Sequence, residues 1–246
     1  MHVRNQPDPD PDPDPDPDPD PDPDPDPDPD PPAGRGSAGR PRASQAERST
    51  QTRNALLESA ARGLSRYGYG NLVLEQVAAD AGYTRGALYH QFKDKQDLTL
   101  AALQWVLDTW EQEVGPLVGR EAEPIAALLA MARGHAVFCR RDFARMAIAL
   151  RLEFTGQNHP VGREVERSYD ELVTLCGGLI DAGRAAGTIP AGPPTRTLAL
   201  ALVGALEGAV VALAGQAPYD ELLAERAVAG VLGLAPAAPD RTKDHR

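Results

Sequence analysis

Residues 81–95 read AGYTRGALYHQFKDK, and this stretch combines a turn, a helix start and a basic, aromatic surface. Gly82 stands where a left-handed residue would end one helix, and Thr84 offers a side-chain cap for the next. Leu88 and Phe92 would share the inner face of that second helix. The residues expected on its outer face are Arg85, Gly86, Tyr89 and His90. The spacing predicts a helix-turn-helix with a polar, basic outer surface.

Helical spacing continues on the N-terminal side of this stretch. Apolar residues recur at i, i+3, i+4 and i+7 in two segments, which are Leu57, Ala60, Ala61 and Leu64, and then Leu74, Val77, Ala78 and Ala81. Residues 67–71, YGYGN, are turn formers that separate the two segments. Ala78 is small enough to allow close helix contact, and Leu88 would pin the pair together. Three helices are therefore expected, the third over residues 84–92.

Many of these positions match a known DNA-binding signature. The matching elements are Gly68-Tyr69, Val77-Ala78, Ala81-Gly82, Thr84-x-Gly86, Leu88-Tyr89, Phe92 and Lys95. At this spacing they resemble the signature of the tetracycline-repressor (TetR) family over about residues 48–105. The resemblance implies a homodimeric one-component repressor. Its C-terminal helical domain would bind a small effector, dimerise through the last two helices, and spread the recognition helices when the effector binds.

One departure from the family pattern concerns the start of the second helix. The family usually has Thr or Ser at the positions of Leu72 and Val73. Neither residue can cap a helix, and loss of such a cap costs ~1 kcal/mol. We expect Asn71 to take the capping role one turn early.

The outer face of the third helix predicts contacts with the major groove of double-stranded DNA, at a near-palindromic operator. Arg85 can donate two hydrogen bonds to guanine O6 and N7, or it can clamp a phosphate instead. Gly86 would let the helix backbone approach closely. Phosphate contacts are expected from Thr84, Tyr89, His90 and Lys95, the last at a helix N-terminus. The alternative is an ordinary helical pair with a solvated face.

Charge is distributed unevenly along the chain, whose formal net charge is −11. The Pro-Asp repeat of residues 7–30 holds 12 of the 36 acidic residues, whereas residues 35–95 carry ten Lys or Arg against five acids. The repeat has no apolar side chains and half its backbone donors are missing, so a solvated polyproline-like rod is expected. The rod is either inert or competes with DNA for a basic linker. The arginines assigned to that linker are Arg35, Arg40, Arg42, Arg48 and Arg53.

The rest of the chain shows helical patterns and no sustained alternation, which favours an all-α fold. A fourth helix is expected from Lys95 to Gly115-Pro116. Further helices are expected over residues 124–139, 141–155, 162–186, 194–215 and 219–234. The predicted divisions are a disordered tract and linker (1–44), a DNA-binding domain (45–95), an effector-binding and dimerisation domain (96–235) and a disordered tail (236–246).

The expected location is the cytoplasm. Cys139 and Cys176 make no disulfide framework, and the N-terminus has no apolar signal region. The most apolar run, residues 198–214, is 17 residues long and contains Glu207. That run is too short for a membrane span, so a buried helix is expected.

The effector pocket is expected among the middle helices. The candidates are Trp105, His135, Phe138, Phe143, Met146, Leu150, Tyr169 and Cys176. Each could equally fill an apolar core. Inward-facing ionisable residues are few, so a small, apolar-leaning effector is expected. His135 and Cys139 have i, i+4 spacing that suits metal ligands, but no second pair accompanies them. We interpret them as a packed thiol beside a hydrogen-bonded histidine, and we expect no metal and no cofactor.

Two further questions concern assembly and enzyme activity. The glycines of Gly204-x-x-x-Gly208 permit close helix contact, either within one subunit or across a dimer seam, and the resemblance favours the seam. No nucleophile–base pair and no carboxylate–histidine metal set is present. The segment GRGSAGR at residues 34–40 lacks the preceding strand of a dinucleotide site. We therefore expect no enzyme, while a ligand-independent architectural DNA-binding protein stays open.

Overall fold

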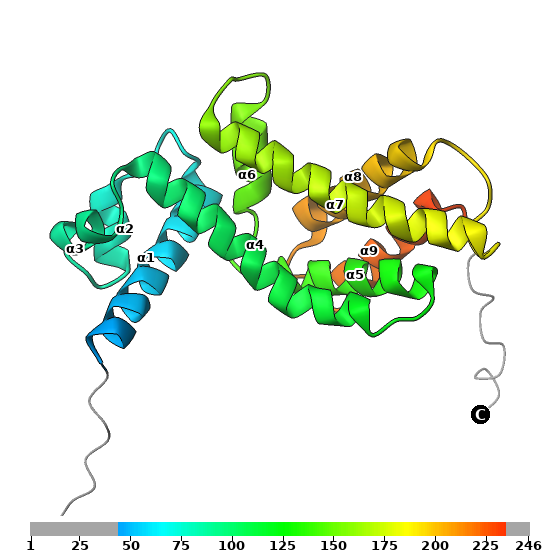
Figure 1. The fold of residues 1–246 in the computed structure, drawn as a ribbon, viewed down its shortest axis with the longest axis horizontal. Coiled ribbons are helices and arrows are strands. Elements are labelled where there is room, and N and C mark those ends of the chain that lie inside the picture. Colours follow the sequence, from blue (N-terminus) through cyan, green and yellow to red (C-terminus); the bar gives the residue numbers. More distant parts are fainter. Residues whose placement is uncertain (1–43, 235–246) are drawn as a thin grey trace, which may run out of the picture. The chain divides into compact units, whose positions relative to one another are not determined.

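The computed structural model describes residues 44–234, and this part of the chain is α-helical with connecting turns (Figure 1). Its helices are α1 (Gln45–Tyr67), α2 (Leu74–Asp80), α3 (Arg85–Gln91), α4 (Lys95–Gly119), α5 (Pro124–Phe138), α6 (Met146–Phe154), α7 (Pro160–Ala185), α8 (Thr195–Leu213) and α9 (Tyr219–Val231). The all-α expectation is confirmed. The Pro-Asp tract, nearly all of the linker and the C-terminal tail lie outside the described residues.

Helix α1 begins with a capping box. The Ser44 hydroxyl accepts a hydrogen bond from the Glu47 backbone N–H at 3.2 Å, and the Ser44 N–H donates to the Glu47 carboxylate at 2.6 Å. Arg48 and Arg53 therefore belong to α1. Assigning them to a linker was wrong, because the serine–glutamate pair starts the helix before them.

Helices α1, α2 and α3 pack around a small apolar core that also includes the start of α4. Leu56, Leu64, Leu88 and Leu98 in this core are completely buried. A buried hydrogen bond also orients α2 on α1, because the Ser59 hydroxyl donates to a carbonyl oxygen of α2 at 2.9 Å. This packing fixes α2 and α3 on a long first helix.

The start of α2 differs from the expectation. Its N-cap residue is Val73, which makes no side-chain capping bond, and the Asn71 amide instead donates to the Tyr67 carbonyl at 3.2 Å. The capping role expected for Asn71 was wrong, because that side chain is used within the turn. Leu72 is only 6% exposed, so this position contributes to the core.

Several helix boundaries differ from the sequence-based ranges, notably those of α4 and α6. Helix α4 continues through Pro116 to Gly119, since a proline in the last turn costs one hydrogen bond but does not end the helix. Helix α6 begins at Met146, five residues later than expected. The preceding turn buries Phe143, while its polar residues ion-pair outward, as in the Asp142–Arg62 pair at 3.3 Å.

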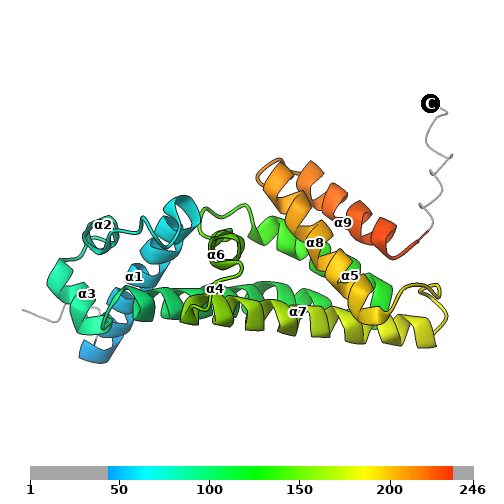
Figure 2. The same cartoon turned by 90° about the horizontal axis from the view of Figure 1, so that it is seen from above.

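The C-terminal helices form a bundle around α4, α5 and α7. Helix α7 runs beside α4, and α8 and α9 lie side by side against α5 (Figure 2). The Arg140 guanidinium, after α5, donates to both carboxylate oxygens of buried Asp220 at 2.9 and 2.8 Å, which ties α5 to α9. The buried cluster runs without interruption from α1 to α9 and crosses residue 95. The division at that residue stays a functional prediction.

Candidate DNA-binding surface and effector cavity

The third helix has the capped start and the two faces that its sequence predicts. The Thr84 hydroxyl accepts from the Ala87 N–H at 3.2 Å, and Gly82 has a φ of 78°, a conformation that favours glycine. Leu88 and Phe92 are buried. The residues exposed on the other face are Arg85, Gly86, Tyr89 and His90. The helix therefore presents these side chains to solvent from a fixed backbone.

Arg85 has a partner that sequence reasoning missed. Its guanidinium forms an ion pair with Glu75 of α2 at 3.0 Å and lies 5.3 Å from the Tyr89 ring centre. A hydrogen bond to Tyr89, together with the charge of Glu75, raises the pKa of Arg85 further above its usual value. Both charged side chains are more than half exposed, so the pair orients Arg85 without burying it. A DNA base that accepts hydrogen bonds from Arg85 must compete with the Glu75 carboxylate or share the guanidinium with it.

Lys95 is already engaged within the chain. Its ammonium donates to the Gly70 carbonyl at 3.0 Å and lies 4.9 Å from the Tyr69 ring centre, and burial lowers its pKa. The expected phosphate site at the start of α4 also contains acids, since Asp94 caps the helix and Asp97 accepts from a backbone N–H. A phosphate contact by Lys95 stays a prediction, and its contact with the turn is an additional structural role.

The C-terminal end of α3 is held by α1. Arg53 donates to the Gln91 carbonyl at 3.2 Å, and its guanidinium stacks 4.5 Å from the Phe92 ring centre. The Gln91 amide donates in turn to the Ser49 hydroxyl at 3.2 Å. Helices α1 and α3 are thus joined at the C-terminal end of α3, whereas the Gly82 turn precedes its N-terminal end. Sequence periodicity gave no signal for these contacts, because the partners are about 40 residues apart.

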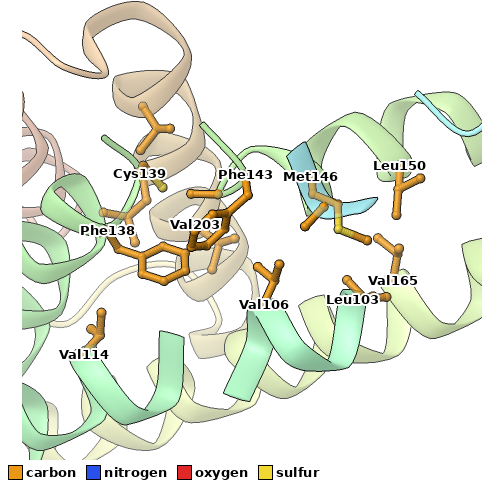
Figure 3. Close-up of a cluster of buried hydrophobic side chains, with 14 of the residues drawn as sticks. Leu103, Val106, Val114, Phe138, Cys139, Phe143, Met146, Leu150, Val165 and Val203 are labelled. Atoms are coloured by element: carbon orange, nitrogen blue, oxygen red, sulfur yellow. The ribbon is translucent and has the colours of Figure 1, made fainter. Parts of the chain in front are cut away.

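A cavity of about 550 Å³ lies among α4, α5, α6, α7 and α8. Figure 3 shows part of its apolar wall, with Val106, Phe138 and Val203 pointing toward one another. Apolar surface dominates the lining, as is typical of small-molecule sites. This cavity is the best-formed candidate for the expected effector pocket.

Only some of the expected pocket residues line this cavity. His135, Phe138 and Tyr169 do so. The others are packed in the surrounding core or partly buried against it, and these are Trp105, Phe143, Met146, Leu150 and Cys176. Helical spacing alone did not distinguish cavity-lining from core residues, because both are apolar and inward.

The cavity wall carries more ionisable side chains than we predict from the sequence. Its ionisable carboxylates and guanidiniums come from Asp108, Glu111, Arg145, Arg167, Glu171 and Glu207. Behind Tyr169, the Arg151 guanidinium stacks 4.0 Å from the ring centre and lies 3.5 Å from the Glu207 carboxylate. Burial, followed by the neighbouring Glu207, raises the pKa of Tyr169. A ligand would therefore meet an apolar interior with polar groups at defined places.

His135 and Cys139 form the hydrogen-bonded arrangement that was expected of them. The Trp110 indole N–H donates to His135 Nδ1 at 3.1 Å, so the neutral imidazole carries its proton on Nε2, which lies 3.6 Å from Cys139 Sγ. Burial lowers the pKa of His135 to about 4 and raises the pKa of Cys139 to about 12. Within residues 44–234 there is no group of three or more His, Cys, Asp or Glu residues that could hold a metal ion.

The enclosed, partly buried imidazole of His135 predicts a pH dependence of stability. The unfolded chain binds a proton at His135 near pH 6.5, whereas the folded chain binds it only near pH 4. This depressed pKa means that stability is fully present above pH 6.5 and is lost as the pH falls, by about 3 kcal/mol in all. Urea unfolding of wild type and His135→Gln at pH 7, 5.5 and 4 measures the effect. The variant should lose less stability on acidification, and equal losses would contradict the assignment.

One face of α8 is apolar and exposed. The exposed positions on this face are Leu200, Ala201, Gly204, Gly208, Val211 and Ala212. Helix α8 is long and apolar enough to span a membrane by length and composition, and only 33% of its apolar window is buried. The expectation of a buried helix was wrong for this face, although the opposite face packs on α7 and α9. Leu222 and Leu223 of α9 are also exposed.

Comparisons with known proteins agree with the fold and with a helix-turn-helix near its start. Residues 56–102 match the family described as bacterial regulatory proteins, tetR family. The HTH-type transcriptional regulator HbdR of Aromatoleum sp. (strain CIB) is 31% identical over 78 residues, which are 32% of this chain and 34% of HbdR. The HTH-type transcriptional regulator AcrR of Shigella flexneri is 46% identical over 48 residues, or 20% of this chain and 22% of AcrR. The chain thus spans about a third of HbdR and less than a quarter of AcrR.

Solved structures extend the likeness across the described helices. SCO4454, a TetR-family transcriptional regulator from Streptomyces coelicolor, has a TM-score of 0.61 at 24% identity, covering 75% of this chain and 95% of that one. AibR, solved with isovaleryl coenzyme A and operator DNA, has a TM-score of 0.60 at 20% identity, covering 75% and 100%. At these identities the likeness establishes the fold.

The capped recognition helix on a three-helix support, followed by a helical bundle, defines the class of helix-turn-helix DNA-binding proteins. Residues 56–102 form a DNA-binding domain of the kind described as bacterial regulatory proteins, tetR family, and the described helices share the fold of TetR-family structures. The relatives named here are transcriptional regulators rather than enzymes.

Proposed function

We propose that this chain is a homodimeric, sequence-specific transcriptional repressor that a small-molecule effector releases from its operator. The observation that carries the proposal is the outer face of α3, where Arg85, Tyr89 and His90 are exposed on a helix held at both ends. We assign the protein to the cytoplasm, where its proposed DNA target would lie.

Base readout is assigned to Arg85, the first residue of α3. Its guanidinium can form two hydrogen bonds with guanine O6 and N7. Gly86 has no side chain, so DNA can approach the helix backbone closely there. Packing within the chain does not require a glycine at this position, because an added Cβ would lie 3.8 Å from the Thr84 hydroxyl and meet no nearer atom. Thr84, Tyr89, His90 and Lys95 are assigned to phosphate.

Tyr89→Phe and Lys95→Ala are expected to weaken binding to all DNA sequences about equally, because phosphate contacts position the protein without reading bases. Loss of Lys95 should also reduce the salt slope by about one unit per subunit. Fluorescence anisotropy with operator and scrambled duplexes at several salt concentrations measures both effects. Thermal unfolding is the control for Lys95, which also binds the Gly70 carbonyl. A changed sequence preference in either variant would refute the phosphate assignment.

Dimerisation is assigned to the exposed faces of α8 and α9. Gly204 and Gly208 carry no side chain there, and a Cβ added to either would meet no atom of its own protomer within 4 Å. A second copy can therefore approach this part of α8 closely. A dimer would bury the apolar face and place two recognition helices on two half-sites of one operator.

The cavity is assigned to the effector. Its volume of about 550 Å³ suits a small-to-medium, apolar-leaning ligand whose polar groups meet Tyr169 or the charged wall residues. The experiment is to titrate the protein on the DNA upstream of its own gene, with and without a panel of metabolites. Release by one compound that also raises the unfolding temperature would support the effector role. Binding that no compound changes, and that is indifferent to sequence, would favour an architectural DNA-binding protein instead.

A further inference from the structure

The turn between α1 and α2 is held by a carboxylate from far along the chain. Glu153, near the end of α6, accepts a hydrogen bond from the Tyr69 N–H at 2.6 Å and another from the Gly70 N–H at 2.7 Å. Each carboxylate oxygen takes one donor, so the contact is bidentate. Hydrogen bonds of this charge-assisted kind are about twice as strong as neutral ones.

The glycines of the turn make room for that carboxylate. Gly68 has a φ of 74°, and a Cβ added there would lie 2.6 Å from Glu153 Oε2. A Cβ on Gly70 would lie 3.3 Å from Oε1, which is also tight. The backbone conformation and the lack of side chains together fit the turn to Glu153.

Aromatic packing and a cation complete the contact. The Tyr69 ring packs edge-on to Phe154 at a centroid distance of 5.3 Å and to His159 at 5.2 Å, and those two rings stack on each other at 4.4 Å. Lys95, at the start of α4, donates to the Gly70 carbonyl on the other side of the turn. The turn is therefore fixed from both α6 and α4.

The same short helix reaches the cavity. Ala147 and Ile148 of α6 line the cavity, and Glu153 lies about one and a half turns further along the helix. Leu150, between them, is completely buried, so α6 is packed as a unit. A displacement of α6 at the cavity must therefore move Glu153 as well.

We propose that Glu153 is the positioning residue through which α6 couples the cavity to the DNA-binding helices. In the empty protein its carboxylate holds the α1–α2 turn, and thereby α2 and α3, in the DNA-binding arrangement. A ligand that displaces α6 withdraws the carboxylate and frees the turn. The inference rests on the proposed effector role of the cavity and adds the contact that transmits it.

The first test does not involve DNA. In Glu153→Gln one oxygen is replaced by an amide NH₂, which cannot accept from a backbone N–H. The Tyr69 and Gly70 amides should then exchange with deuterium roughly tenfold faster, as measured by NMR, since a hydrogen bond to a charged group is lost. The matched control is Glu113→Gln, which removes an exposed carboxylate that pairs with Arg141. Unchanged exchange at both amides in Glu153→Gln would overturn the proposal.

The second test asks whether the cavity acts through this contact. Ala147→Phe would place a larger side chain in the cavity without any ligand, and Ile148→Trp serves if that variant does not fold. Either should speed exchange at Tyr69 and Gly70 and weaken operator binding. The loss of affinity should be much smaller in a Glu153→Gln background, because that contact is already weakened.

Full additivity of the two substitutions would overturn the proposal and indicate transmission through α4, which also lines the cavity. The exchange measurement distinguishes this failure from failure of the proposed function. Wild type and the Ala147→Phe variant could both bind operator and scrambled DNA equally, while Ala147→Phe still speeds exchange at the Tyr69 and Gly70 amides. That result would support the coupling through Glu153 and contradict the repressor role.

Discussion

Replacing Arg85 with alanine is expected to abolish the preference for the operator while leaving the fold intact. Arg85 is the first residue of α3, and its side chain is 63% exposed. Its ion pair is with Glu75, itself more than half exposed, and exposed pairs add little to stability. The lost bidentate contact should cost about 1–3 kcal/mol at each half-site, or roughly 5- to 150-fold in affinity. Both half-sites of a dimer would lose it.

Gel shifts with operator variants measure this effect, with one base pair changed at a time. In wild type, one guanine position per half-site should be strongly preferred, and that preference should disappear in Arg85→Ala. Glu75→Gln is the matched control, because it breaks the same ion pair but keeps the guanidinium. Unchanged base preference in Arg85→Ala would mean that Arg85 contacts only phosphate.

Gly204→Leu is expected to yield monomers with poor operator affinity. A Cβ added at Gly204 would meet no atom of its own protomer within 4 Å, so the substitution should leave the protomer folded. Across a seam of closely packed α8 helices the added leucine would have no room. Losing the second half-site removes the gain from bivalent binding, so operator affinity should fall at least about 100-fold.

Light scattering at several protein concentrations reports the mass, and anisotropy reports operator binding. Gly178→Leu on α7 is the matched control, since Gly178 is also an exposed helical glycine whose added Cβ would meet no atom within 4 Å. The control should remain dimeric. A Gly204→Leu protein that still has the mass of a dimer would place the interface elsewhere.

The helix-turn-helix could be predicted from sequence because its determinants are local. The glycine at 82, the cap at Thr84 and the inner Leu88 lie within seven residues, and each has a defined stereochemical role. Contacts of the same elements with distant segments left no such signal. Glu153 meets Tyr69 across 84 residues, and its neighbours in sequence give no indication of a turn partner.

The cavity was less predictable for a related reason. In α5 both faces are apolar, so periodicity could not separate residues that line a cavity from residues that fill a core. Phe138 and Phe143 are both buried aromatic residues, yet only Phe138 lines the cavity. In α8 the same ambiguity concealed an exposed apolar face. The sequence indicated that Gly204 and Gly208 permit close helix contact. The extent of the exposed apolar face of α8, however, depends on where α7 and α9 pack.

The central claim is that the outer face of α3 reads a DNA sequence. The most direct measurement is the affinity of the full chain for the duplex that it protects upstream of its gene, compared with a scrambled duplex of equal length and composition at 150 mM salt. We predict a ratio of about 10³ or more in favour of the protected duplex, which is typical of specific binding. Equal affinities for the two duplexes would contradict the claim.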